Sequence, residues 1–159
     1  MNSMLRRFEK ITRASGGMSY GLDENEVQSH PFDERNIHPD LWDLCKSLFD
    51  DGHYSQTTFE AFKYLDNRVK KLSHSDKTGY KLMMSALGSD SPAIVLSDLS
   101  TETGKDIQKG FQFLFSGGVM AIRNPRGHEA NYGETIEECL DHLAFASLLL
   151  KTLDARISP

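Results

Sequence analysis

The chain has 159 residues, of which 26% are charged and 38% are hydrophobic, and its formal net charge is -5 at pH 7. This length fits one domain that buries a real core, while the negative charge excludes a protein that coats nucleic acid with a generally basic surface. No apolar run reaches the roughly 18 residues of a membrane span and no signal peptide opens the chain, so we expect a cytoplasmic protein without a membrane partner.

Residues 1–35 differ in composition from the rest of the chain. The stretches ASGGMSYG and DENEVQSHPFDER are polar and are broken by glycine and proline. Segments of this kind bury little apolar surface. We therefore expect a partly irregular N-terminal arm over residues 1–35, with a short helix at 4–13, followed by a helical domain over residues 36–157.

Helical spacing begins after the arm. The stretch HPDLWDLCKSLFDDG places Pro39 in a first helical turn and Gly52 at a natural stop. YSQTTFEAFKYLDNRVKKL and TGYKLMMSAL continue with two more helical segments. GSDSPAIVLSDLSTETG is expected to be a loop, in which AIVL is extended chain with no strand to pair with.

Two further helices complete the prediction. A long helix is expected from about residue 102 to 122, and Gly117 and Gly118 within it favour either close helix packing or a bend. The last helix opens with the capping-box pattern Thr135-Ile-Glu-Glu138 and continues to Ile157. The fold class is therefore all-α, an antiparallel bundle of four to five helices. The expected apolar face of the long helix consists of Ile107, Phe111, Leu114, Phe115, Val119 and Ile122.

Outside one motif, few residues are candidates for catalysis, metal binding or substrate binding. Cys45 and Cys139 lie in apolar helical patterns and outside any CxxC pair, so we expect buried free thiols. The histidines lack the spacing of zinc ligands, and no metal site is predicted. His53 fits a structural role at a helix start or a role in substrate binding. Glu60 is a candidate partner for an arginine of the motif described next.

The motif is AIRNPRGHEAN, residues 121–131, which follows a strongly apolar segment. Pro125 disfavours a helical backbone at Asn124, and Asn-Pro is a favoured start for a helix. We therefore predict that one helix ends here and another begins with Asn124 as its N-cap. Arg123 and His128 would then meet across the helix start, whereas on an unbroken helix they would point about 140° apart.

Arginine and histidine together suit phosphate chemistry. A guanidinium presents a planar fork of donors to a phosphate, and an imidazole exchanges protons near neutral pH. RNA supplies its own nucleophile, the 2′-OH, so a base and a cation suffice for cleavage without a metal. The same pattern also fits a helix corner tied by side-chain hydrogen bonds, and spacing alone leaves both interpretations open.

Longer stretches carry a family resemblance. Four stretches resemble, in this order, the Ymh-type family of prokaryotic and phage proteins: IHPDLWDLCKSLFDDGHYSQTTFEAFKYLDNRVK, TGYKLMMSAL, IQKGFQFLFSGGVMAIRNPRGH and LAFASLLLKTLD. RNPRGH is also similar to the signature of the wider HEPN superfamily: an arginine, a polar residue, a short spacer and a histidine. That resemblance implies a helical bundle that dimerises so that two motifs face each other. Its catalytic members are metal-independent ribonucleases of toxin–antitoxin pairs, phage resistance and CRISPR effectors.

The resemblance assigns roles by motif position. Arg123 is expected to stabilise the scissile phosphate, Asn124 to orient the pair, and His128 to act as the acid–base group, while Arg126 and Lys109 are expected to contact the RNA. We therefore expect a homodimeric endoribonuclease that needs no cofactor, with RNA as substrate and an antitoxin or defence-system protein as a further partner. HEPN toxins silenced by a nucleotidyltransferase carry a tyrosine two residues after the histidine, whereas this chain has Ala130 there and its nearest tyrosine is Tyr132. A non-catalytic HEPN-like module that binds RNA, a nucleotide or a protein remains the alternative.

Overall fold

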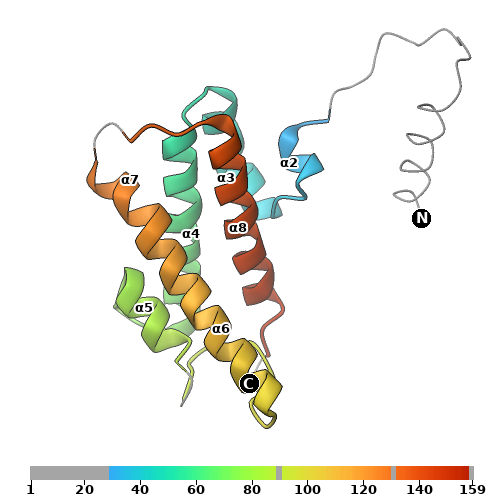
Figure 1. Ribbon diagram of the computed structural model, residues 1–159, viewed down its shortest axis with the longest axis vertical. Coiled ribbons are helices and arrows are strands. Elements are labelled where there is room, and N and C mark those ends of the chain that lie inside the picture. The colour runs from blue at the N-terminus through green and yellow to red at the C-terminus, as the bar shows by residue number, and fades with distance from the viewer. Residues whose placement is uncertain (1–28, 89–90, 130–131, 158–159) are drawn as a thin grey trace, which may run out of the picture.

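The computed structural model describes residues 29–88, 91–129 and 132–157, in which the regular structure is helical. Apart from one isolated bridge between Val95 and Ile157, these ranges hold no strand pairing, so the all-α prediction is confirmed. The helix predicted at 4–13 lies outside the described residues. The elements, labelled as in Figure 1, are α2 (Pro31–Glu34), α3 (Pro39–Asp50), α4 (Tyr54–Ser73), α5 (Gly79–Ala86), α6 (Glu102–Gly118), the π-helical turn η1 (Val119–Arg123), α7 (Asn124–His128) and α8 (Ile136–Asp154).

Local signals set most helix ends where the sequence predicts them. Pro39 opens α3, and Gly52 follows α3 with a left-handed φ of +78° that suits glycine. The capping box of Thr135 and Glu138 is formed at the start of α8. That helix stops at Asp154, before its predicted end, and beyond it the Ile157 N–H donates to the Val95 carbonyl at 2.9 Å. None of the described helices is long and apolar enough to cross a membrane.

The direction of the long helices α3, α4, α6 and α8 alternates along the chain, so α4 and α8 run parallel. Near the start of α4, the Thr58 hydroxyl donates to Glu134, just before α8, and near its end Arg68 pairs with Asp154. Figure 1 shows α4 and α8 descending side by side while α6 runs in the opposite direction. The antiparallel prediction therefore describes consecutive long helices, whereas α4 and α8 run parallel because α6 returns the chain to the end where α4 began.

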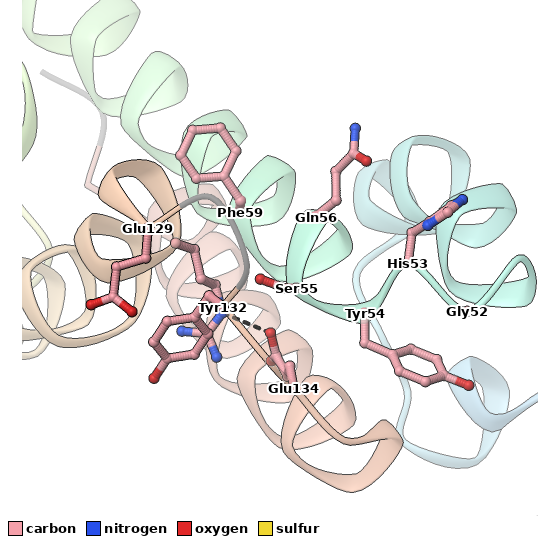
Figure 2. Close-up of a pocket in the computed structure, with 10 residues that line it drawn as sticks. Gly52, His53, Tyr54, Ser55, Gln56, Phe59, Glu129, Tyr132 and Glu134 are labelled. Atoms are coloured by element: carbon pink, nitrogen blue, oxygen red, sulfur yellow. Dashed lines mark hydrogen bonds and ion pairs between the residues drawn. The ribbon is translucent and has the colours of Figure 1, made fainter.

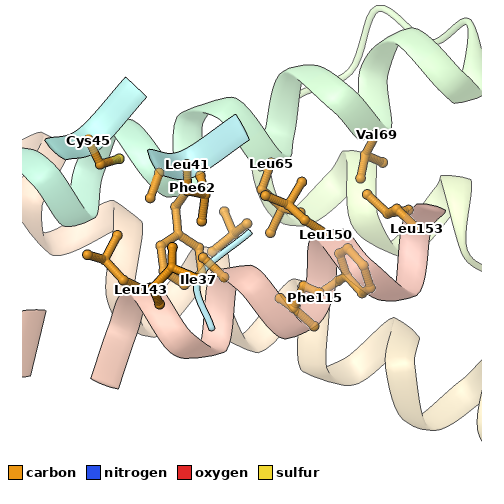
Figure 3. Packing of buried hydrophobic residues seen from close by; sticks show 14 of the residues in the cluster. Ile37, Leu41, Cys45, Phe62, Leu65, Val69, Phe115, Leu143, Leu150 and Leu153 are labelled. Carbon is orange, nitrogen blue, oxygen red and sulfur yellow. The ribbon is translucent and has the colours of Figure 1, made fainter. Parts of the chain in front are cut away.

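The core lies between α3, α4, α5, α6 and α8, and Figure 3 shows part of it. Phe32 of α2 is fully buried, so the segment predicted as an arm contributes to the core at this position. Cys45 and Cys139 are buried free thiols, as predicted, and burial raises the pKa of both to about 12. The labelled core residues of Figure 3 are Ile37, Leu41, Cys45, Phe62, Leu65, Val69, Phe115, Leu143, Leu150 and Leu153.

The inward face of α6 is more polar than predicted. Gln108 and Gln112 are buried, and their amides donate to the carbonyls of Leu87, Ile94 and Met84 at 2.9–3.1 Å. These carbonyls lie in α5 and the loop after it and need donors once they are buried. The prediction that Ile107 and Leu114 face the core is wrong: their side chains are 43% and 44% exposed.

Candidate functional site

The RNPRGH motif lies on helical backbone that continues from α6 through η1 into α7. Arg123 and Asn124 both have right-handed helical dihedrals, and the Asn124 N–H donates to the Val119 carbonyl across the wider π turn. The predicted helix break at Asn124 is therefore wrong. A proline inside a helix removes a donor and crowds the preceding turn, and an inserted π turn is one way in which a helix accommodates such a conflict.

Continuity of the helix separates the two expected catalytic groups. Five helical steps lie between Arg123 and His128, so their side chains project about 140° apart. Among the described residues no hydrogen bond joins them, and His128 is exposed. The expected meeting of guanidinium and imidazole across a helix start therefore has no basis within one chain.

The Arg123 guanidinium is held from two sides. Its Nη1 donates to Asn124 Oδ1 at 3.2 Å, which brings the expected polar partner into contact with it. The guanidinium lies over the Phe59 ring at 5.4 Å from the ring centroid. The backbone also passes close to this ring, since a Cβ on Gly127 would lie 3.1 Å from it. Among the described residues, Arg123 Nε is buried without a hydrogen-bond partner, as is Arg68 Nε on α4. The Arg123 residue as a whole is only half-buried.

Arg126 has a different environment from Arg123. Its side chain is 3% exposed, and its Nε donates to Glu134 Oε2 at 2.6 Å. Its Nη1 donates to the Ile122 carbonyl at 2.7 Å, and the guanidinium lies 4.6 Å from the centroid of the Tyr132 ring. Contacts within the protein therefore already occupy the Arg126 guanidinium. The expected RNA contact of Arg126 stays a prediction, and any such contact would compete with these partners.

Glu134 is the centre of this buried polar network. Its side chain is fully buried and accepts hydrogen bonds from Arg126, from the Thr58 hydroxyl at 2.7 Å and from His142 Nδ1 at 2.7 Å. Burial alone raises the pKa of Glu134, but the hydrogen bonds from His142, Arg126 and Thr58 outweigh it, and its pKa lies below the usual value. The network therefore ties α7 to α4 and α8 around an ionised carboxylate.

Two other predicted residues lie apart from this cluster. Lys109 is exposed on α6, and the helical rise places it about 20 Å along the axis from Arg123. One chain therefore does not bring Lys109 to the motif. Glu60 pairs with Lys63 of its own helix at 3.2 Å, so the expected pairing with a motif arginine is wrong.

A polar pocket with a cavity volume of about 420 Å³ opens beside the motif (Figure 2). One wall is the start of α4, with His53, Ser55, Gln56 and Phe59, and the other carries Arg126, Glu129, Tyr132 and Glu134. Phe59 belongs to both features, because its ring also supports Arg123.

A protein-family model matches residues 35–153, under the description of a protein of unknown function, Hypoth_Ymh. The chain belongs to the Ymh family. The match covers most of the predicted 37–154 resemblance and includes the motif and both walls of the pocket. No curated protein and no solved structure matches this Ymh protein.

The sequence of this Ymh protein does not mark every residue of the site. Phe59 is one apolar position among several on a helix, and Glu134 stands in a polar link that reads as a surface turn. The only sequence signal near Glu134 is its place just before the capping box of α8. Among the described residues, no group of three His, Cys, Asp or Glu side chains is placed to hold a metal ion.

Proposed function

We propose that this Ymh protein is a metal-independent endoribonuclease of HEPN type. The observation that carries the proposal is the environment of Arg123: the residue is only half-buried, and Phe59 and Asn124 hold its guanidinium in place. A guanidinium held in place suits the developing charge of a phosphorane, which preorganised donors stabilise strongly. The same helical segment presents His128 to solvent, where a substrate can reach it.

The chemistry requires no cofactor. The His128 imidazole takes the proton of the 2′-OH, and the 2′-oxygen then forms a bond to the adjacent phosphorus. The bond from phosphorus to the 5′-oxygen breaks, and the 5′-oxygen takes up a proton from an acid group or water. The products are one fragment that ends in a 2′,3′-cyclic phosphate and one that begins with a 5′-hydroxyl.

A second copy of the chain supplies what one chain lacks. Because Arg123 and His128 diverge on one helix, we place each active site between two chains, with the arginine from one and the histidine from the other. The outer face of α6 and η1 fits this role, since Phe113 and Leu114 of α6 and Met120 of η1 are 55%, 44% and 52% exposed. Exposed apolar faces of this kind favour contact with another protein surface, and this face leads directly into the motif.

The test is cleavage of single-stranded RNA by the purified protein in the presence of EDTA. We expect products with 2′,3′-cyclic phosphate ends. Arg123→Ala and His128→Ala should each lower the rate at least about 100-fold, since general acid–base groups and charge-stabilising donors contribute on this scale.

Matched substitutions outside the motif control for nonspecific damage. Arg35→Ala removes an arginine that pairs with Asp141 at the surface. His74→Asn removes an imidazole at a left-handed residue with φ of +50°, a conformation that asparagine tolerates. Both variants should cleave like the wild type. Full activity of either motif variant, or activity only with added divalent metal, would contradict the assignment.

The proposed biological setting is phage defence or a toxin–antitoxin system, with an antitoxin or defence protein as partner. Expression of the wild type in bacteria should arrest growth and fragment RNA, and His128→Ala should do neither.

The alternative is a non-catalytic HEPN-like module that binds RNA, a nucleotide or a protein. The divergence of Arg123 and His128 in one chain favours this alternative, and saturable RNA binding without turnover would support it.

A further inference from the structure

The polar pocket of Figure 2 lies next to the phosphate site that we propose. Phe59 links the two, because its ring lines the pocket and also supports the Arg123 guanidinium. A volume of about 420 Å³ falls in the range of pockets that bind small molecules. A strand of RNA whose phosphate contacts Arg123 therefore has one nucleoside close to this pocket.

The charge of the pocket argues against a second phosphate. Its arginine, Arg126, is already neutralised by the buried carboxylate of Glu134. Glu129 adds a further negative charge to the rim of the pocket. A phosphate bound there would face an uncompensated carboxylate, whereas a neutral ligand would not.

The walls instead match a flat, neutral ligand with a polar edge. Phe59 and Tyr132 supply aromatic surface beside the arginines that lie over their rings, Arg123 and Arg126. The Ser55 hydroxyl and the Gln56 amide can each donate and accept hydrogen bonds. Proteins bind unpaired RNA bases with this combination of aromatic stacking and hydrogen bonds to the base edge. The wall residues on α4 sit within two turns of one helix, so their relative positions are fixed by regular backbone.

We propose that this pocket holds one unpaired nucleobase of the RNA, next to the phosphate bound at Arg123. The inference rests on the proposed function and adds to it a base that positions the cleaved bond. A stacked base contributes about 1–3 kcal/mol, which corresponds to a roughly 5- to 100-fold change in affinity.

The experiment separates binding from cleavage. The full chain carrying His128→Ala is titrated, in EDTA, against a fluorescently labelled single-stranded RNA and a series in which each nucleotide in turn is abasic. One abasic position should weaken binding about 5- to 100-fold. With Gln56→Ala added, the loss of affinity caused by that abasic position should shrink. Asn67→Ala, which replaces an exposed amide on the same helix, should leave this loss of affinity unchanged.

A second variant, Phe59→Leu, removes the aromatic surface but keeps an apolar side chain. In this variant, as in Gln56→Ala, the loss of affinity caused by the abasic position should shrink. If every abasic position weakens binding less than twofold, the base pocket is overturned, even when the wild type cleaves RNA. If one position is sensitive and Gln56→Ala suppresses its penalty, the pocket stands, even when the wild type cleaves nothing and the nuclease proposal fails.

A competition arm identifies the source of the base. Nucleoside monophosphates should displace the RNA weakly, and ribose 5-phosphate, which keeps the phosphate but lacks a base, should displace it less well. Equal displacement by the two competitors would contradict recognition of a base. A monophosphate that binds more tightly than the RNA would assign the pocket to free nucleotides and overturn its proposed role in RNA.

Discussion

At the residue scale, the two arginines of the motif have opposite roles in the structure. Arg123 is only half-buried and contacts Asn124 and the Phe59 ring, while the side chain of Arg126 is buried and enclosed by Glu134 and the Ile122 carbonyl. The Arg126–Glu134 pair holds α7 against the segment just before α8. We therefore interpret Arg123 as the group that faces substrate and Arg126 as a group that fixes its backbone.

Replacing Glu134 should test that interpretation. Glu134→Gln removes the charge that compensates the buried Arg126 guanidinium. Loss of one partner of a buried ion pair is strongly destabilising, so we expect the free energy of unfolding at pH 7 to fall by about 3 kcal/mol. Urea unfolding followed by circular dichroism measures this change. Glu102→Gln, which removes a carboxylate that is 89% exposed, should leave stability unchanged.

The effect of Glu134→Gln should also depend on pH. Because the pKa of Glu134 is lowered in the folded protein, its ionisation stabilises the fold above the ordinary glutamate pKa of about 4.3. That stabilisation is lost as the pH falls further, through the folded pKa. The stability difference between wild type and Glu134→Gln should therefore shrink below about pH 4. A difference that stays constant between pH 7 and pH 3 would contradict the lowered pKa.

At the element scale, the end of α6 shows why neighbouring glycines are not equivalent. A Cβ on Gly118 would lie 3.0 Å from ring carbons of both Phe62 and Phe145, whereas a Cβ on Gly117 would meet nothing within 4 Å. Of the two predicted alternatives, close packing therefore explains Gly118. The local change in the helix is the π turn that begins at Val119.

This difference predicts the effect of a single added methyl group. Gly117→Ala and Gly118→Ala gain the same helix propensity, so the difference between them isolates packing. We expect Gly118→Ala to be less stable than Gly117→Ala by about 1–3 kcal/mol, the usual cost of overpacking. Urea unfolding at protein concentrations low enough to keep the chain monomeric provides the comparison. Equal stability of the two variants would show that the rings of Phe62 and Phe145 move aside freely.

At the scale of the whole molecule, the proposed site needs two chains, and this requirement has a distinctive consequence. If each site combines Arg123 of one chain with His128 of the other, mixing the two inactive variants Arg123→Ala and His128→Ala restores one intact site per mixed dimer. With random exchange about half of the dimers are mixed, so activity should recover to about a quarter of the wild-type level. Cleavage assays on the mixture after subunit exchange measure this recovery.

Two results would contradict the shared site. If both groups act within one chain, mixed dimers contain no intact site and activity does not return. The interface itself is tested by Leu114→Arg, which places a charge on the exposed apolar face of α6 and should convert the protein to an inactive monomer in sedimentation experiments. Leu44→Arg, on α3 and 38% exposed, provides a matched control on another face.

The sequence by itself determined the features that depend on near neighbours in the chain. Proline at the start of α3, the capping box of α8 and the apolar spacing of α4 fix where these helices lie. The buried thiols follow from the same spacing. The motif was also visible in the sequence, since its residues are contiguous, and the family match contains it.

Only the tertiary structure decided how these helices meet and what the motif can do. Thr58 and Glu134, 76 positions apart, meet because α4 and α8 run parallel. Gln108 is buried because loop carbonyls require its amide. The backbone at Asn124 stays helical although the local Asn-Pro signal favours a break. In each case contacts between distant segments outweigh a preference set by near neighbours, and such contacts have no signature in any short stretch of sequence.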